Sequence, residues 1–324
     1  MGITNFPFGV SSFGVPVMGA GVPATPGNFL FVDYTTGDDS RTLKTVSAQH
    51  PLKTVAKAYD LARTNKDDVI VLMGNASHVL TSMLTVSKSR VHFVGMDGTA
   101  RKYGQNAKIS LGVTTAATDI GTILNTGVRN SFHNIKFTNA NTVTEGIYCF
   151  VEGGEYTTIS NCEIYKETDL DNTSAAELVM NGDSAQVINC TIGSLANAQT
   201  GTTVRPCVLV TAGVAGAGKV ARDVLFKGCN FWKSAGHVNG RHVYGANATD
   251  VERIMIFDDC DFINAKLAVA VPAQCIAFGS TLTVGQVLVK NCNSINNTKL
   301  STTTGVLITG PVPTYATSGI AVQS

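Results

Sequence analysis

Six short segments of the chain repeat one pattern of apolar and polar residues. Each has two or three apolar residues in alternation, then Asn, Asp or Gly, then Cys, then one polar residue and usually an aromatic residue or Ile. The segments are SFHNIKFTN from Ser131 (with Ile135 in place of Cys), TTISNCEIY from Thr157, AQVINCTIG from Ala185, VLFKGCNFW from Val224, IMIFDDCDF from Ile254 and QVLVKNCNS from Gln286. Successive Cys positions are 28, 39, 31 and 32 residues apart. A repeat of this length predicts one strand-containing coil per repeat.

A second apolar segment precedes four of the repeats, as in GIYCFVEG, AELVMNG, PCVLVTAG and QCIAFGS. The spacers between these segments and the repeats vary in length, so loops are expected to leave the stack there. Abundant β-branched and turn residues favour an all-β chain. The pattern is typical of a right-handed parallel β-helix, in which equivalent residues of adjacent coils lie about 4.8 Å apart. We predict this solenoid over residues 67–299, with roughly eight coils.

The recurring Cys is predicted to point inward as a small hydrophobic residue. The column consists of Cys162, Cys190, Cys229, Cys260 and Cys292, and a second, looser column holds Cys149, Cys207 and Cys275. A buried, reduced column argues against disulfides despite the even number of Cys. The sequence has no CxxC and no His at ligand spacing to a pair of Cys, so we predict no metal site and no cofactor.

Residues 28–66 are predicted to form an opening strand and a capping helix. The helix is expected from Pro51 to Ala62, with Leu52, Val55, Ala56, Tyr59 and Ala62 on one face. The buried strand DDVIVLMG follows. Together, the passage VD…GDDS…PLKT…DVIVL…G resembles the N-terminal module of many bacterial and phage β-helix proteins. That resemblance implies that the helix covers the open end of the solenoid, where the core and a sheet edge are otherwise exposed.

Both ends of the chain lack charged residues, although the whole chain has a net charge of +1. Residues 1–27 are apolar and interrupted by Gly and Pro, which disfavour a helix or a central strand. We interpret them as an extended anchoring arm and residues 300–324 as a C-terminal cap or tail. The proposed anchoring side chains are Phe6, Phe8, Phe13, Val15, Val17 and Met18. The balanced charge indicates no nucleic-acid partner, and no apolar run is long enough to suggest a membrane partner.

Three motifs are candidates for a binding or catalytic site, and none is assigned as a catalytic site. GVAGAGKV, from Gly213, matches GxxxxGK but lacks the following Ser or Thr, so a glycine loop is favoured. Asp258, Asp259 and Asp261 lie close enough in the chain for two of them to act as a catalytic acid and base. However, Asp258 and Asp259 occupy turn positions of the repeat. In addition, Gly236-His237 precedes the aspartates, whereas polygalacturonases have Gly-His after the Asp pair. HVNGRHVYG, from His237, is interpreted as a solvated turn or subunit contact rather than a sugar contact.

The opening ITNFPFGVSSFGVPVMG…TPGNFLFVD resembles the start of tailed-phage virion proteins. The resemblance implies a non-enzymatic virion protein with a pectate-lyase-like β-helix, displayed as a capsid decoration, head fibre or tail component. It also implies a homotrimer whose partners are the major capsid or another virion protein, with a host-surface glycan as a further partner. The alternative is a tailspike-like or pectin-lyase-like polysaccharide-binding or polysaccharide-degrading enzyme. Two or three acidic groups converging beside an Arg or Lys would favour this alternative.

Overall fold

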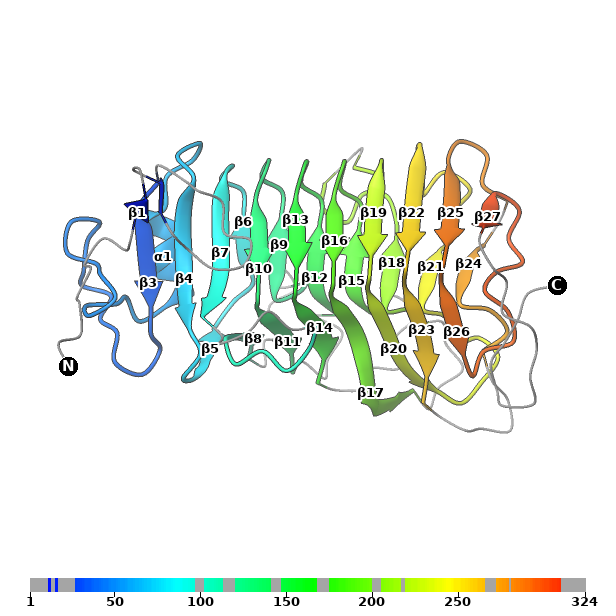
Figure 1. The fold of residues 1–324 in the computed structure, drawn as a ribbon, viewed down its shortest axis with the longest axis horizontal. Helices are drawn as coiled ribbons and strands as arrows, with labels where there is room; N and C mark the ends of the chain where they lie inside the picture. Colours follow the sequence, from blue (N-terminus) through cyan, green and yellow to red (C-terminus); the bar gives the residue numbers. More distant parts are fainter. Residues whose placement is uncertain are drawn as a thin grey trace.

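A computed structural model describes residues 11–12, 15–16, 27–96, 102–112, 120–140, 147–167, 175–199, 205–216, 219–265, 272–279 and 281–309. These residues wind into an elongated stack of coils (Figure 1). The strands form three long parallel sheets that run along the stack. The architecture confirms the predicted all-β parallel β-helix.

The three sheets are built by taking one strand from each coil in turn. Sheet 1 contains β3 (Phe29–Val32), β4 (Asp68–Met73), β7 (Val91–Met96), β10 (Ser131–His133), β13 (Thr158–Ser160), β16 (Gln186–Ile188), β19 (Val224–Lys227), β22 (Ile254–Asp258), β25 (Gln286–Lys290) and β27 (Val306–Thr309). Sheet 2 contains β5 (Ser77–Leu80), β8 (Lys108–Leu111), β11 (Lys136–Asn139), β14 (Glu163–Lys166), β17 (Thr191–Gln199), β20 (Asn230–Ala235), β23 (Asp261–Asn264) and β26 (Asn293–Ile295). Sheet 3 contains β6 (Leu84–Val86), β9 (Ile123–Asn125), β12 (Tyr148–Glu152), β15 (Ala176–Met180), β18 (Val208–Val210), β21 (Val243–Gly245) and β24 (Ile276–Phe278).

The turn from sheet 1 to sheet 2 is short and recurs along the solenoid. From β10 onward, one residue of each of these turns adopts a positive φ, between 52° and 62°. These residues are Asn134, Asn161, Asn189, Gly228, Asp259 and Asn291. Asn, Asp and Gly tolerate this left-handed conformation better than other residues do. The Asn, Asp or Gly of the repeat is therefore a backbone requirement, and it explains Asp259 without catalysis.

The inward side chains of successive coils stack on one another. Phe93 lies over Phe132 with ring centroids 5.0 Å apart, and Phe226 lies over Phe257 at 4.9 Å. In the coils of Phe226 and Phe257, the next inward-facing residue is a Cys of the column. All eight Cys of the chain are free and buried. Each column thiol donates to a carbonyl oxygen of the preceding coil, as from Cys229 to Val187 at 3.3 Å. The same bond recurs in Cys162, Cys190, Cys260 and Cys292.

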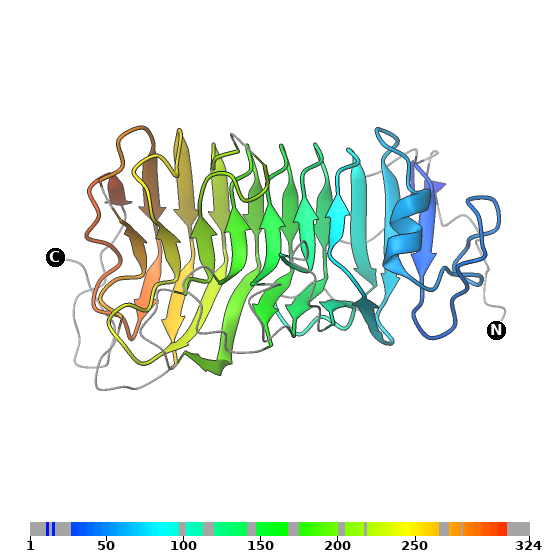
Figure 2. The same cartoon turned by 180° about the vertical axis from the view of Figure 1, so that it is seen from behind.

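Helix α1 (Val55–Leu61) covers the N-terminal end of the stack (Figure 2). It starts four residues later than predicted, because Thr54 is the N-cap and its side chain accepts a hydrogen bond from the Lys57 amide. Leu52 instead forms a parallel bridge with Val32. The buried face contains Ala58, whereas the predicted Ala56 is exposed.

The predicted terminal segments are only partly described. In the arm, β1 (Ser11–Ser12) pairs antiparallel with β2 (Val15–Pro16). Phe6, Phe8, Phe13, Val17 and Met18 lie outside the described residues, so their anchoring role stays a prediction. Within residues 300–324, β27 adds a tenth strand to sheet 1 at the end opposite α1. No helix in the described ranges is long and apolar enough to cross a membrane.

Candidate functional site

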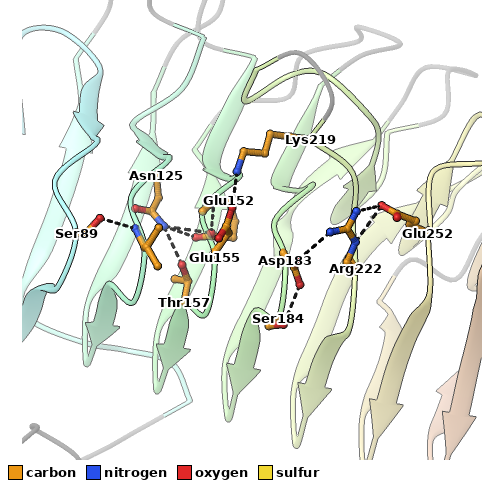
Figure 3. Close-up of polar contacts among 12 residues, drawn as sticks. Ser89, Asn125, Glu152, Glu155, Thr157, Asp183, Ser184, Lys219, Arg222 and Glu252 are labelled. Carbon is orange, nitrogen blue, oxygen red and sulfur yellow. Dashed lines mark hydrogen bonds and ion pairs between the residues drawn. The ribbon is translucent and has the colours of Figure 1, made fainter.

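Polar side chains converge where the strands of sheet 3 turn towards sheet 1 (Figure 3). Glu152 ends β12 and is fully buried. Its Oε1 accepts hydrogen bonds from the Gly154 amide (2.8 Å) and from Asn125 Nδ2 (3.1 Å), and its Oε2 accepts from Asn125 Nδ2 at 2.9 Å. Asn125 also donates to Thr157 Oγ1 at 3.0 Å and accepts from Asn130 at 2.8 Å. A buried carboxyl is thus held in a chain of amide and hydroxyl groups.

Glycines allow the neighbouring coils to approach this carboxyl closely. A Cβ at Gly154 would overlap the carbonyl of Gly127, and one at Gly182 would lie 2.7 Å from the carbonyl of Gly154. A Cβ at Gly153 would overlap the methyl group of Ala215. Residues 211–216 therefore pack directly onto the turn that follows Glu152.

The 211–216 loop is also tied to the site by Asn181. The Asn181 amide, oriented by its neighbours, donates to the carbonyl of Glu152 at 2.9 Å. Its oxygen accepts from the amides of Ala215 (3.1 Å) and Val214 (3.3 Å). The loop closes on itself through a bond from the Gly213 amide to the Lys219 carbonyl at 3.0 Å. Residues 213–216 of the GxxxxGK motif thus pack over the turn, and β19 rather than a helix follows the motif.

Burial raises the pKa of Glu152 to about 7, because a carboxylate loses its hydration there. The donors Asn125, Gly154 and Thr157 and the positive charge of Lys219 oppose this effect without cancelling it. Lys219 Nζ lies 3.2 Å from Glu155 Oε1, and Figure 3 shows its side chain reaching down towards Glu155 and Glu152. Near neutral pH, Glu152 can therefore hold or release a proton.

Charged residues continue from this point along the turns of successive coils. Glu155, Asp183 and Arg222 are joined by parallel bridges, one residue per coil. Arg222 pairs with Asp183 at 3.2 Å and, on its other side, with Glu252. Arg253 lies 3.7 Å from Asp183. The structure thus places Glu152 and Glu155 on one coil and Asp183 on the next, with Lys219 beside Glu155 and Arg222 beside Asp183. Acidic groups on adjoining turns beside a Lys and an Arg favour the alternative function.

A second group of buried charges lies at the corner between sheets 2 and 3. The Lys166 amide donates to Glu177 Oε2 at 2.5 Å, and Lys233 Nζ donates to the Arg205 carbonyl. Burial lowers the pKa of Lys233 to about 8 and raises that of Glu177 to about 7. Burial also lowers the pKa of His242 to about 3, so this histidine is neutral. The part of the chain that the structure describes contains no group of His, Cys, Asp or Glu suited to hold a metal ion.

Of the three motifs considered from the sequence, GVAGAGKV lies beside the Glu152 group and supplies Lys219, whereas the Asp258–Asp261 and His237–Gly245 motifs lie in later coils. Asp258 ends β22 and lies 3.7 Å from Lys290, while Asp261 starts β23 and accepts from Asn293. His242 is a buried residue packed against Phe262, with ring centroids 5.7 Å apart, so the interpretation of that segment as a solvated turn is wrong there. The sequence reasoning missed Glu152. Its only signal was a polar residue just before glycine at the end of sheet 3 strands, as in VEGG and VMNG.

Comparison with protein-family models and with curated sequences found no match. Solved structures do match. The pectin methylesterase of Aspergillus niger aligns with a TM-score of 0.55 and 13% identity over 87% of this chain and 84% of that chain. Pectate lyase Pel9A aligns with a TM-score of 0.54 and 14% identity over 84% of this chain and 68% of that chain. ORF18 of Geobacillus virus E2 aligns at 0.46 and 10%, over 76% of this chain and 50% of that chain, and carries no argument for a virion role.

These comparisons contradict the prediction of a non-enzymatic protein, because the matched pectin methylesterase and pectate lyase are enzymes. That prediction relied on the resemblance to phage virion proteins, on the low aromatic content of 7% and on the chain order of Asp258, Asp259 and His237. In a solenoid, side chains about 30 residues apart meet when their coils are adjacent, so the order of residues in a short motif is a poor guide to a site. At these identities the likeness shows the fold and assigns no activity. The chain folds as a right-handed parallel β-helix of the kind seen in pectate lyases and pectin methylesterases.

Proposed function

We propose that the protein cleaves glycosidic bonds of a polysaccharide at the turns between sheets 3 and 1. The observation that carries the proposal is the buried Glu152, with a pKa of about 7, close in the chain to Glu155 and next to the coil that carries Asp183. Glycoside cleavage needs a carboxylic acid that stays protonated near neutral pH and a second carboxylate that stays charged. The similar solved structures act on pectic material, which makes acidic polysaccharides the first substrates to test.

In the proposed hydrolysis, Glu152 gives its proton to the oxygen of the glycosidic bond as the bond to the anomeric carbon breaks. Water adds to the anomeric carbon, and Glu155 accepts the proton that this water loses. Lys219 Nζ lies 3.2 Å from Glu155 Oε1 and orients that carboxylate. The proton count balances, and the proton on Glu155 returns to Glu152 through solvent before the next turnover.

Access to Glu152 requires the 211–216 loop to move, since the carboxyl is fully buried beneath it. The loop has two glycines with positive φ, Gly213 at 85° and Gly216 at 136°, and a Cβ at either would meet no atom within 4 Å. Glycine is suited to a segment that must change conformation. The proposed function therefore includes opening of this loop when substrate binds.

The test is release of reducing ends from polygalacturonate, methyl-esterified pectin, rhamnogalacturonan and bacterial capsular polysaccharides. Glu152→Gln is expected to lower the rate at least a hundredfold, as loss of a general acid does. Glu252→Gln, a matched change at the far end of the same row of charges, is expected to retain activity. Equal rates for wild type and Glu152→Gln would refute the proposal.

The location of the protein stays a prediction from the sequence. The charge-free arm, Met1 to Thr25, supports attachment to a virion, where a polysaccharide-cleaving β-helix would meet the host surface. The homotrimer implied by the resemblance is likewise a prediction. Both are compatible with a catalytic role at Glu152, because the arm and the site occupy different parts of the chain.

A further inference from the structure

Surface aromatic residues gather on the outer face of sheet 2. Trp232 in β20 is the only Trp of the chain, and it is partly exposed. The ring of Tyr103 lies against it, with centroids 5.2 Å apart and planes at 47°, and Tyr103 is 54% exposed. Tyr165, also partly exposed, faces outward from β14 on the same sheet. Aromatic rings with one free face can stack on flat, partly apolar ligands.

The spacing of these rings is set by the ladder of strands. β17 lies between β14 and β20, and its Gly193 pairs with Trp232. Gly193 has a φ of 99°, and a Cβ there would overlap the Trp232 carbonyl, so no side chain stands between the two aromatic residues. Two strand intervals separate Tyr165 from Trp232 by about 10 Å. That separation suits two rings of one extended sugar chain lying along the solenoid axis.

A row of polar side chains runs parallel to the aromatic residues. Successive strands place Glu163, Thr191, Asn230 and Asp261 in register on this face. Thr191 is fully buried, and its Oγ1 has no hydrogen-bond partner within the described structure. Trp232 Nε1 likewise lacks a partner there. Buried polar groups are almost always hydrogen-bonded, so these two atoms point to a missing polar ligand.

Residues 102–107 cross this face and carry Tyr103 to Trp232 (Figure 1). The Gly104 amide donates to Glu163 Oε2 at 2.9 Å, and Gln105 Nε2 donates to the Asn161 carbonyl at 2.6 Å. Gly104 has a φ of 76° and open space around its Cβ position. These two bonds tie the segment to sheet 2 and the Tyr103 ring lies on Trp232, so we expect a ligand that reaches Thr191 Oγ1 and Trp232 Nε1 to displace the segment.

We propose that this face, formed by Tyr103, Tyr165, Thr191 and Trp232, binds the pyranose rings of an oligosaccharide. The rings stack on Trp232 and Tyr103, and their hydroxyl groups accept from Trp232 Nε1 and bond to Thr191 Oγ1. Two lysines of this sheet are paired with carboxylates, Lys136 with Glu163 at 3.1 Å and Lys108 with Glu167 at 2.5 Å, which disfavours nucleic acid. The row of polar side chains disfavours an apolar peptide. This site lies on a different face of the solenoid from Glu152. The choice of a sugar as its ligand rests on the proposed function, whereas the site itself does not.

Because Trp232 is the only Trp, its fluorescence reports the site directly. Titration of the full chain with oligogalacturonate and cello-oligosaccharide hexamers is expected to change the emission in a saturable way with at least one of them. Tyr103→Ala and Thr191→Val are expected to weaken that binding at least tenfold. Tyr156→Ala is the matched control, since Tyr156 is equally exposed, at 55%, on another face, where it contacts Arg129.

Circular dichroism of each variant checks that the solenoid is folded. No saturable change with either hexamer, or unchanged affinity in both Tyr103→Ala and Thr191→Val, would overturn the proposal. Glu152→Gln separates the two proposals, because it is expected to abolish cleavage and leave the fluorescence titration unchanged. If Glu152→Gln retained cleavage but Tyr103→Ala lost binding, the cleavage proposal would fail and the sugar-binding face would stand.

Discussion

Replacing Glu152 by Gln should change how the stability of the protein depends on pH. Burial raises the pKa of Glu152 from its ordinary 4.5 to about 7 in the folded protein. Each pKa unit corresponds to about 1.36 kcal/mol, so the shift is equivalent to roughly 3 kcal/mol. The folded state binds this proton more tightly than the unfolded state. The free energy of unfolding therefore falls by about that amount as pH rises from 4.5 through 7, and the loss is complete above this window.

Glutamine has nearly the same shape and does not titrate, so Glu152→Gln should lack this loss. The assay is urea denaturation followed by circular dichroism at several pH values between 4 and 8, with wild type and variant compared at each. The difference between the two removes the contributions of other buried groups such as Glu177. Relative to wild type, the variant should gain about 3 kcal/mol between pH 4 and pH 8. A difference that is the same at every pH would show that Glu152 is not held protonated.

Lys219→Met gives an independent check on the same carboxyl. The positive charge of Lys219 lowers the pKa of Glu152, so its removal should raise that pKa further. The window in which stability falls should then move to higher pH, and the pH limit of cleavage should move with it. A shift in the opposite direction would contradict the electrostatic account of the site.

Three further predictions concern other parts of the chain. Cys190→Ala should lower the free energy of unfolding by on the order of 1 kcal/mol through a small cavity, as urea denaturation would show, and a Cys162–Cys190 disulfide in unreduced mass spectra would contradict the buried thiol column. Lys233→Met should raise the free energy of unfolding at pH 7 by up to about 3 kcal/mol, because burial lowers the pKa of Lys233 to about 8. This gain should shrink towards pH 10, where the wild-type lysine loses its proton in the folded state, and an equal gain at pH 7 and pH 10 would refute the prediction. Deleting Met1 to Thr25 should leave the solenoid folded and abolish co-sedimentation with particles that lack the native protein, whereas attachment at normal occupancy would place the anchor elsewhere.

The sequence by itself determined the coil and its repeat. Alternating apolar residues, a turn residue that tolerates positive φ and a small inward residue are local requirements, and each coil must meet them again. The Asn161, Asn189 and Asn291 turns and the Cys190 and Cys229 positions were therefore visible as a pattern. The helix was also predicted, but its start was placed at Pro51. The structure begins α1 at Val55, because the side chain of Thr54 rather than His50-Pro51 caps the helix.

Only the tertiary structure decided which residues form a site. Glu152, Asp183 and Lys219 come from different coils, and the spacers between them vary in length, so their meeting depends on strand register and on how the 211–216 loop folds back. The pKa of Glu152 depends on burial, which no local pattern records. Tyr103 reaches Trp232 across the outside of several coils. A repeat specifies what every coil shares, whereas a site is made of what single coils do not share, and those contacts exist only once the coils are stacked.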